Sequence, residues 1–513
     1  RFLSSSLGKL DSSKKEQNYF NIYIDVYCII FVKKMLKKFI LTALLTSQFL
    51  TAQTFCKNGF AKEYPCKGFD LMSRIPVSVL ANTDGTPEGS DLWGWTDTTT
   101  GKEYAIAAMT NSTAFVDVTD PLNPLFLGRL DSNAGNNYWR DVKIYNDYAF
   151  IVADNTGAHG MQVFDLKKLR TANENSTHTA DKIYTNVNSC HNIFINEDTA
   201  IAYLVGCGGY YNGGPNFVDI SDPENPIDLG GYADEGYTHD AQVVTYNGPD
   251  TRYTGKEIFI GSNATKVVIL DVTAKNNIQK IASINYEQLG YTHQGWFTED
   301  QRYFILGDET DEKNFGMNTR TLIFDFNDLQ NPILSSTYLG TSAAIDHNGY
   351  VLGNEYYMAS YRAGLRVFDI TNIANASSAM KEVAYFDTYP ANNSTAFNGA
   401  WSVYPYFASG NIIINDIERG LLVVRKSGTL GLDTKKLKSN FSIFPNPAAE
   451  KTTITSTNNQ IIRSIKIYSI LGKKLMDIKN INQSKYVLET KNFQRGVYLV
   501  QINNMMMEKI VVQ

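Results

Sequence analysis

One line of sequence recurs along the chain, an apolar triplet that ends in Asp and runs into a turn. Clear copies are A-F-V-D-V-T-D-P-L-N-P from Ala114 and N-F-V-D-I-S-D-P-E-N-P from Asn216. A seventh copy, G-L-L-V-V-R-K from Gly420, lacks the Asp. In the other six copies the Asp recurs at intervals of 44 to 54 residues. Its positions are Asp117, Asp165, Asp219, Asp271, Asp325 and Asp369. A period of this length is typical of architectures built from repeated small sheets or helix pairs.

Each copy is the third of four short strands with alternating apolar residues. The third repeat shows H-N-I-F-I from His191, A-I-A-Y-L-V from Ala200, N-F-V-D-I from Asn216 and I-D-L-G-G-Y from Ile227. A four-stranded antiparallel sheet of this kind cannot bury both faces alone, and radial stacking of such sheets solves the problem. The pattern predicts an all-β fold, a seven-bladed β-propeller over residues 53–425. A β-sandwich or a solenoid is the alternative.

The two ends of the predicted propeller complement each other. The seventh copy ends near Arg425 without a fourth strand, whereas F-D-L-M-S-R-I from Phe69 resembles the fourth strand F-L-G-R-L from Phe126. We therefore expect the N-terminal strand to complete the last blade, because closure removes the exposed edges of a linear array.

The V-F-D, F-V-D and I-L-D lines of the repeats resemble the LVIVD-type propeller repeats of secreted choice-of-anchor B proteins. The resemblance covers roughly residues 53–425. It implies a propeller fold and an exported location, and it carries over no biochemical activity.

The composition changes after Lys426. Residues 426–440 are polar and basic, as in a linker, and residues 441–513 show the short alternating strands of a small β-sandwich. This segment is similar to the type A C-terminal sorting domain of the type IX secretion system, through F-P-N-P from Phe444, I-L-G-K from Ile470 and G-V-Y from Gly496. The resemblance implies a Bacteroidota-type cell, contact with the type IX machinery, and anchoring on the outer surface or release. An ordinary adhesive sandwich domain is the alternative.

Residues 35–52 have the order of a secretory signal peptide: a Met, two lysines, an apolar stretch and small residues before Gln53. The apolar stretch is too short to span a membrane. Residues 1–34 precede this signal and are expected to be translated upstream sequence that is not native to the protein. Export through the inner membrane, followed by delivery to the outer surface or the medium, is the expected location.

The net charge of −5 conceals segments of opposite sign. Residues 1–52 carry 8 Lys and Arg against 3 Asp and Glu, and residues 441–513 carry 10 against 4. The body between them holds 29 basic and 45 acidic residues. An acidic body of this size repels phosphate backbones, which excludes nucleic acid as a partner and favours divalent cations or neutral ligands.

Export permits disulfide bonds between the four cysteines of the mature chain. Cys56 and Cys66 flank a short loop near the mature N-terminus. The segment from Cys190 to Cys207 is expected to form a hairpin that turns near Asp198 and places the two cysteines opposite each other. Two free buried thiols at Cys190 and Cys207 are the alternative for the second pair.

Four of the six histidines fall in one repeated position at the start of the first strands, in consecutive blades. Aligned by blade, this position holds Leu92, Arg140, His191, His239, His293, His347 and Asn398. First strands line the central channel of a propeller, so four imidazoles are expected to converge near its axis. Neutral imidazole is a ligand for zinc, copper or iron, and the four histidines are candidate metal ligands.

Acidic residues are expected to surround the histidines on the same face and to orient their rings. These candidates are Asp154, Asp308, Glu309 and Asp416 at the ends of second strands, together with Asp240. The alternative for the histidines is a structural role, in which each ring bonds a neighbouring blade. The segment that contains Asp308, Glu309, Asp311 and Glu312 lacks the spacing of a calcium loop and is expected to be solvated.

The residues define no catalytic motif of the kinds that mark serine hydrolases, zinc proteases, P-loop enzymes or dinucleotide-binding enzymes. We therefore expect a binding module for an extracellular protein, peptide or glycan, with its ligand face at the four-histidine end of the channel. A metal-dependent enzyme at the same ring, oxidative enzymes included, is the alternative.

Overall fold

The computed structural model describes residues 53–428 except 84, and residues 441–512 except 457–460, 470–473, 492, 494, 504 and 505. Contacts divide the chain into two units, Arg1–Thr429 and Leu430–Gln513. The predicted upstream residues, the signal peptide and most of the predicted linker lie outside the described residues.

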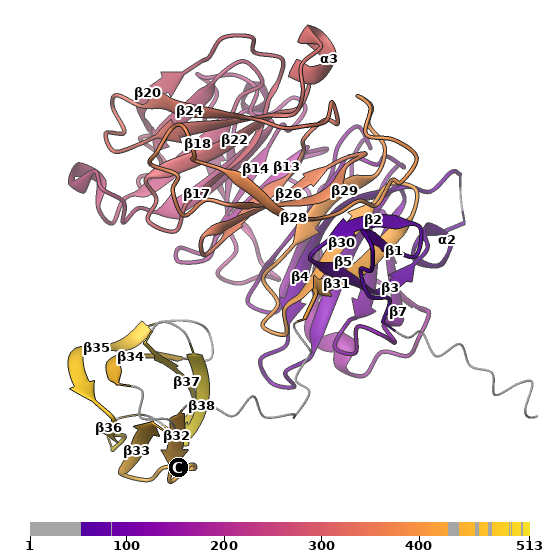
Figure 1. Ribbon diagram of the computed structural model, residues 1–513. Coiled ribbons are helices and arrows are strands. Elements are labelled where there is room, and N and C mark those ends of the chain that lie inside the picture. Colours follow the sequence, from indigo (N-terminus) through magenta and orange to yellow (C-terminus); the bar gives the residue numbers. More distant parts are fainter. Residues whose placement is uncertain are drawn as a thin grey trace, which may run out of the picture. The chain divides into compact units, whose positions relative to one another are not determined.

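Seven four-stranded antiparallel sheets make up the first unit, as predicted (Figure 1). The first three are β4 (Gly89–Thr96), β5 (Glu103–Met109), β6 (Ser112–Asp117) and β7 (Leu125–Asp131); β8 (Arg140–Tyr145), β9 (Tyr148–Ala153), β10 (Met161–Asp165) and β12 (Lys182–Tyr184); and β13 (Asn192–Asn196), β14 (Ile201–Val205), β15 (Asn216–Asp219) and β16 (Ile227–Gly231).

The next three sheets repeat the same order of strands. They are β17 (Asp240–Thr245), β18 (Glu257–Ser262), β19 (Val267–Asp271) and β20 (Gln279–Ile284); β21 (Thr292–Phe297), β22 (Tyr303–Asp308), β23 (Arg320–Asp325) and β24 (Ile333–Leu339); and β25 (Gly349–Leu352), β26 (Glu355–Ser360), β27 (Gly364–Asp369) and β28 (Lys381–Phe386).

The seventh sheet joins the two ends of the propeller, which confirms the predicted closure. It contains β29 (Ala400–Tyr404), β30 (Asn411–Asp416), β31 (Gly420–Lys426) and the N-terminal strand β3 (Phe69–Ile75). In its register Phe69 pairs with Lys426 and Ile75 pairs with Leu421. The inner strands then contact one another in a closed circle, in the order β4, β8, β13, β17, β21, β25 and β29, and back to β4. The first unit is therefore a seven-bladed β-propeller.

The repeated Asp has one structural role in all six copies. Its side chain follows the third strand of the blade and accepts a hydrogen bond from the backbone N–H two residues further on, at 2.8 to 3.0 Å. This is the turn that Asp forms readily, because its short carboxylate reaches its own downstream backbone. The sequence signature thus marks the point where each third strand ends.

The core lies between the blades, where apolar side chains of neighbouring sheets interdigitate. All seven residues of β5 are buried. One cluster joins Ile106 of the first blade to Val142 and Ile151 of the second. Because each sheet is covered on both faces, its strands are apolar on both sides, and a fully buried Val or Ile contributes roughly 1.5–3 kcal/mol.

Short elements decorate the propeller. β1 (Phe60–Ala61) and β2 (Tyr64–Lys67) extend the sixth sheet beyond β28, and β11 (Ser176–His178) adds in parallel to β7. The helical turns are α2 (Val77–Leu80), α3 (Asp311–Phe315), η1 (Leu166–Arg170), η2 (Tyr211–Gly213) and η3 (Thr251–Tyr253). Among the described residues, none of the helices has the length and apolar character required to span a membrane.

The second unit contains two small sheets around a core of its own. One consists of β32 (Phe441–Phe444), β33 (Lys451–Ser456) and β36 (Lys485–Glu489); the other consists of β34 (Ile462–Ser469), β35 (Lys474–Gln483), β37 (Gly496–Ile502) and β38 (Met506–Val512). Ile454 and Ile465 are fully buried in one apolar cluster. The predicted motif that starts at Ile470 lies outside the described residues.

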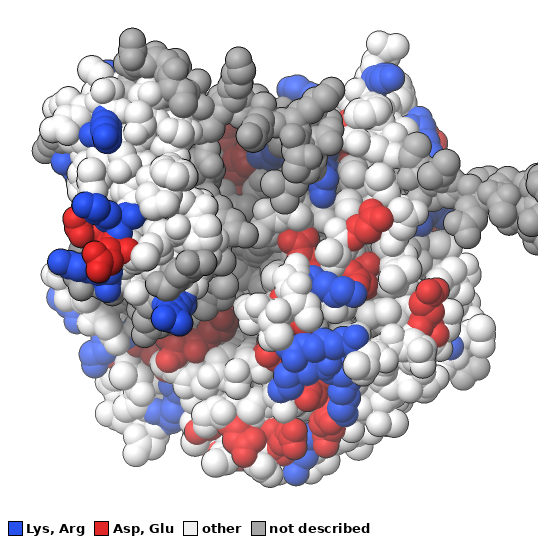
Figure 2. Space-filling model, turned by 90° about the horizontal axis from the view of Figure 1, so that it is seen from below, with Lys and Arg blue, Asp and Glu red and all other residues white. Residues whose placement is uncertain are grey.

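Charged side chains are mixed over the surface. On the face drawn in Figure 2, the described Lys and Arg side chains lie among Asp and Glu side chains.

Candidate functional site

The four histidines lie in a row around one end of the channel. His191 and His239 directly precede β13 and β17, His293 lies in β21, and His347 precedes β25. Successive rings are neighbours, with centroid separations of 4.2 Å between His191 and His239, 4.3 Å between His239 and His293, and 4.3 Å between His293 and His347. The repeat therefore brings together imidazoles that lie about fifty residues apart in the chain.

In the first and last blades, the residues predicted to occupy the histidine position are wrong by two or three places in the sequence. His239 Nδ1 contacts the carbonyl of His293 in the next blade, and His347 Nδ1 contacts the carbonyl of Trp401 in the same way. Trp401, not Asn398, is therefore the seventh member of the ring.

The first blade shows a displacement of two residues in the opposite direction. Ser90 Oγ donates to the carbonyl of Arg140 at 3.1 Å, so Ser90 takes the position assigned to Leu92. Leu92 is buried in an apolar cluster instead. A register shift lies at each of these two positions, between Gly89 and Leu92 and between Ala400 and Ser402, and a similar shift between Thr292 and Gln294 lies at His293.

Arg140 also holds its predicted position, but its side chain leaves the ring. Its guanidinium donates to the carbonyls of Thr110 and Asn137 and lies 3.4 Å from His159 Nε2. His159 is a fifth, fully buried histidine beside the ring. The row of imidazoles therefore ends at His191.

Hydrogen bonds fix the protonation of three rings. His191 Nδ1 lies 2.9 Å from Asp154 Oδ2, and the Nδ1 atoms of His239 and His347 lie 3.1 Å and 2.6 Å from backbone carbonyls. Carboxylate and carbonyl oxygens accept hydrogen bonds, so Nδ1 carries the proton in each ring. Each Nε2 then keeps its lone pair, which is the arrangement of metal-binding histidines.

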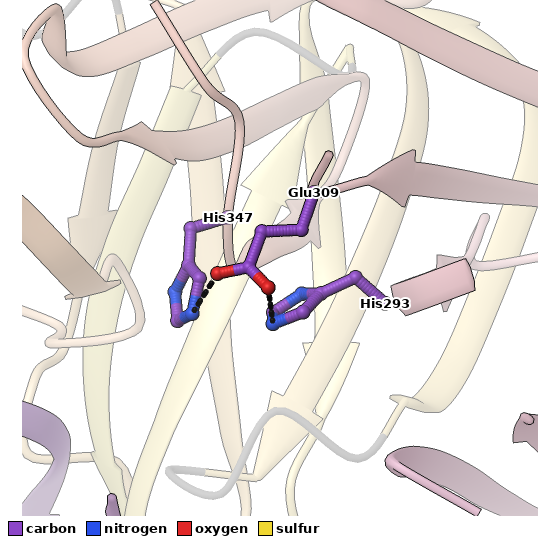
Figure 3. Close-up of side chains that lie close together, drawn as sticks. All are labelled: His293, Glu309 and His347. Carbon is purple, nitrogen blue, oxygen red and sulfur yellow. Dashed lines mark ion pairs between the residues drawn. The ribbon is translucent and has the colours of Figure 1, made fainter. Parts of the chain in front are cut away.

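Glu309 stands between two of the rings (Figure 3). It directly follows β22, and its Oε2 lies 3.8 Å from His293 Nε2 while its Oε1 lies 3.7 Å from His347 Nε2. The Tyr361 hydroxyl donates to Glu309 Oε1 at 2.8 Å. Tyr361 has a φ of 22°, a strained value for a bulky residue of the kind that concentrates at functional sites.

Burial keeps the imidazoles of His239, His293 and His347 neutral. It lowers the pKa of His239 and His293 well below the usual value, and it lowers the pKa of His347 to about 3. Burial likewise raises the pKa of Glu309 to about 7. Because desolvation penalises charge, the site presents uncharged nitrogen donors near neutral pH.

Of the five acids predicted to orient the rings, Asp154 alone forms a hydrogen bond with a ring in the described structure, through His191, while Glu309 faces two rings at longer distances. Asp240 accepts from Asn192 Nδ2 at 2.9 Å, one residue beyond the histidine position. Asp308 is fully buried and accepts from the backbone of Gly290 and Tyr291. Asp416 accepts from the backbone of Glu418 and Arg419.

A small cavity of about 10 Å³ lies between the four imidazoles and the side chains of Asp91 and Asn348. This volume is about that of one water molecule or ion. Below the rings, Lys143 Nζ pairs with Asp141 at 2.6 Å within the channel. Burial raises the pKa of Asp91 to about 7 and that of Asp240 to about 8.

An aromatic pocket of about 290 Å³ opens at the same end of the channel. Its lining residues are Glu88, Tyr138, Trp139, Glu309, Tyr361, Phe397, Asn398, Trp401 and Ile417. This pocket was not predicted from the sequence, because its aromatic residues come from different blades and, apart from Trp401, fall outside the repeated position. Trp401 was visible only as the Trp of N-G-A-W from Asn398.

The acidic segment expected to be solvated is buried instead. Asp311 is fully buried, Glu312 is 2% exposed, and the neighbouring Asp346 is 1% exposed. Arg320 Nε pairs with Asp311 Oδ2 at 2.6 Å. Both carboxylate oxygens of Glu312 and of Asp346 lack hydrogen-bond partners among the described residues, and burial together with the charge of Asp311 raises the pKa of Glu312 to about 9.

Both cysteine pairs are bonded in the structure, Cys56 with Cys66 and Cys190 with Cys207. The register of β13 with β14 pairs Asn192 with Val205, which places Cys190 opposite Cys207. The second bond lies next to His191 and therefore ties down one end of the histidine row.

Comparison with known proteins identifies the second unit. Residues 442–513 match the family model described as a secretion system C-terminal sorting domain. None of the curated proteins compared matches the chain.

Solved structures similar to the chain have low sequence identity. A functionally unknown protein from Desulfotomaculum acetoxidans DSM 771 is 12% identical, with a TM-score of 0.42. The match covers 60% of this chain and 88% of that protein's chain. A protein from Lactobacillus plantarum is 12% identical over 79% of this chain and 99% of its own, with a TM-score of 0.43. The β-propeller domain of Myceliophteria thermophila Cps50 (Swd1) is 8% identical over 66% and 99%, with a TM-score of 0.39.

The closed ring of seven sheets and the C-terminal segment that matches the family model together define the class of protein. The chain is a secreted β-propeller with a type IX C-terminal sorting domain, which directs it across the outer membrane to the cell surface or the medium.

Proposed function

We propose that the protein is a binding module of the cell surface, related to the LVIVD-repeat propellers of choice-of-anchor B proteins, and that its ligand enters the aromatic pocket. The observation that carries this proposal is the lining of the pocket. Five aromatic side chains and the carboxyl groups of Glu88 and Glu309 surround a space of about 290 Å³. The propeller supplies a rigid frame for these side chains, as binding sites require.

The chemistry of the lining favours a cationic organic group. Tyr138 and Trp139 lie edge to face with centroids 5.2 Å apart, and Tyr138 and Trp401 lie 5.7 Å apart. Aromatic faces attract alkylammonium groups, and carboxylates strengthen the attraction. The described lining contains no Lys or Arg, and two nearby cations are already engaged: Lys313 Nζ lies 5.3 Å from the centroid of the Phe397 ring, and Arg362 donates to Asn398 Oδ1. A lysine side chain of an extracellular peptide is the simplest ligand of this kind.

Tryptophan fluorescence tests the proposal. Butylammonium and a lysine-containing peptide should quench or shift the emission saturably, whereas butanol and neutral sugars should not. Phe397→Ala should weaken binding several-fold, because Phe397 lines the pocket and is 41% exposed. Phe60→Ala is the matched control, since Phe60 is an exposed aromatic residue that does not line the pocket. Equal binding of butanol, or an equal loss in both variants, would contradict the proposal.

A metal-dependent enzyme is the second candidate function. The observation that favours it is the double role of Glu309, which lines the pocket and also faces His293 and His347. A ligand in the pocket would therefore lie beside these imidazoles. Turnover of an oxidisable ligand that requires added metal would support the enzyme, and binding without any metal-dependent turnover would support the binding module.

A further inference from the structure

We propose that His293, Glu309 and His347 bind a single divalent transition-metal ion. One donor atom from each of the three residues lies within 4.8 Å of the others, and among the described residues no other group of three or more His, Cys, Asp or Glu meets this condition. Figure 3 shows the carboxylate of Glu309 between the two rings, with one oxygen toward each. The proposal is independent of the ligand proposed for the pocket.

The separations suit a tetrahedral ion. With bonds of about 2.0–2.1 Å, the donor atoms of a tetrahedral zinc site lie about 3.3 Å apart. Glu309 Oε2 lies 3.8 Å from His293 Nε2 and Oε1 lies 3.7 Å from His347 Nε2; with one donor atom from each residue, the three atoms lie within 4.8 Å of one another, so the side chains would close by up to about 1.5 Å around an ion. These distances are too long for hydrogen bonds. The two rings therefore face the carboxylate across a gap that a shared ion would bridge.

Neighbouring groups already hold two of the ligands in place. His347 donates from Nδ1 to the Trp401 carbonyl, which leaves Nε2 free to bind. The Tyr361 hydroxyl donates to one oxygen of Glu309. Such outer contacts fix the orientation of metal ligands and increase metal affinity. His293 is held between the rings of His239 and His347.

The ligand set indicates the type of ion. Two imidazoles and one carboxylate suit zinc and other divalent first-row metals. Three protein ligands leave one position of a tetrahedral ion open, and Glu309 also lines the aromatic pocket. The open position would therefore lie beside the pocket.

The proposal narrows the row of four histidines to two ligands. His191 has its Nδ1 on Asp154 and lies at the end of the row, separated from His293 by His239. Its side chain is 14% exposed, against 4% for His347, so its replacement should disturb the fold no more than replacement of His347 does. His191→Ala is therefore a matched control for His347→Ala.

The experiment uses the full chain purified without an affinity tag and stripped with a chelator. Titration with Zn²⁺ should show one site per chain, and Co²⁺ should give the intense visible absorption of a tetrahedral complex. His347→Ala and Glu309→Gln should lose both signals, whereas His191→Ala should retain them. Circular dichroism checks that each variant is folded.

A milder variant keeps the test decisive if His347→Ala fails to fold. Tyr361→Phe preserves the ring and removes the hydrogen bond to Glu309, so Zn²⁺ should bind about 10-fold more weakly or worse. Absence of a stoichiometric site, or equal loss of metal in His191→Ala, would overturn the proposal. Binding of butylammonium measured with and without Zn²⁺ reports on the pocket separately.

Discussion

Arg170 of the second blade donates two hydrogen bonds to the carboxylate of Asp97 in the first blade, from Nε to Oδ2 at 2.7 Å and from Nη2 to Oδ1 at 2.8 Å. The same carboxylate accepts from the backbone of Thr99 and the hydroxyl of Thr100. These contacts, with the hydrogen bonds from Arg170 foremost, hold the pKa of Asp97 below its ordinary value. Two neighbouring blades are thus joined by a single side chain.

Asp97→Asn should lower the free energy of unfolding by about 1–3 kcal/mol, because Arg170 loses a charged acceptor and the buried cluster loses hydrogen bonds. Denaturant unfolding at pH 7 measures the change. Asp120→Asn is the control, since Asp120 lies in an exposed turn. The stabilisation by Asp97 is present above the ordinary Asp pKa and is lost as the pH falls through its lowered value, so the two proteins should converge in acid. A constant difference at all pH values would contradict this account.

A second prediction concerns the pH dependence of stability. Burial, together with the charge of Arg140, lowers the pKa of His159 to about 4. The unfolded chain takes up this proton near pH 6.5, so protonation favours unfolding as the pH falls from 6.5 to 4. Relative to His159→Gln, the wild-type protein should lose up to about 3 kcal/mol over this range, and the difference should be constant above pH 7. Parallel pH profiles for the two proteins would refute the prediction.

Removal of the bond between Cys190 and Cys207 should destabilise the propeller. Closing a loop of this length restricts the unfolded chain, and its loss costs about 3 kcal/mol. The double variant Cys190→Ser and Cys207→Ser should therefore unfold at a lower temperature than the wild-type protein under non-reducing conditions. The two proteins should behave alike under reducing conditions, and detection of free thiols at these positions by mass spectrometry would show that the bond does not form.

The closing strand can be tested by deletion and by addition. A chain that starts after Ile75 lacks β3 and should expose the edge of β31, because Phe69 to Ile75 supply its partner in the seventh sheet. Its seventh blade should become sensitive to proteolysis, and a peptide of residues 69–75 should restore protection. A scrambled peptide of the same composition is the control. Full protection of the truncated chain would mean that the ring closes without β3.

The buried acids give a prediction of opposite sign. Both carboxylate oxygens of Glu312 lack partners among the described residues, and Asp311 lies near enough to raise the pKa of Glu312. Glu312→Gln should raise the melting temperature at pH 7 in the presence of a chelator, because the buried carboxyl group must take up a proton when the chain folds, whereas the amide need not. A fall in the melting temperature would instead reveal a favourable partner for this carboxylate.

The repeat was sufficient to predict the blades, because the Asp that defines it also ends each third strand. The pairing of the N-terminal strand with the last blade could be predicted by counting strands. The seventh copy of the repeat has no fourth strand after it, so that strand must come from another part of the chain. The position of Trp401 was missed although it follows His347 by 54 residues, the interval that also separates His239 from His293 and His293 from His347. Ser90 was missed because a bulge between Gly89 and Leu92 disturbs the register of the first blade. The histidine row was therefore predicted in its four central members and missed at its ends.

The pocket and the acid cluster depend on contacts between blades. Tyr138, Tyr361 and Phe397 lie in loops of different blades and meet only after the ring has formed. Asp346 is buried with Glu312 although more than thirty residues separate them. Local spacing suggested a solvated acidic loop, because burial by a neighbouring blade is not visible in the segment itself.

The pairing of β3 with β31 means that the propeller can close only after nearly all of its residues have been synthesised. β31 ends at Lys426, shortly before the matched sorting domain begins at residue 442. A product that stops short within the propeller therefore lacks both the strand that seals its ring and the tail that directs its export. Such a fragment exposes an unpaired blade to proteases and lacks the sorting domain. The molecules that are exported to the surface should therefore be those that contain both strands of the closing pair.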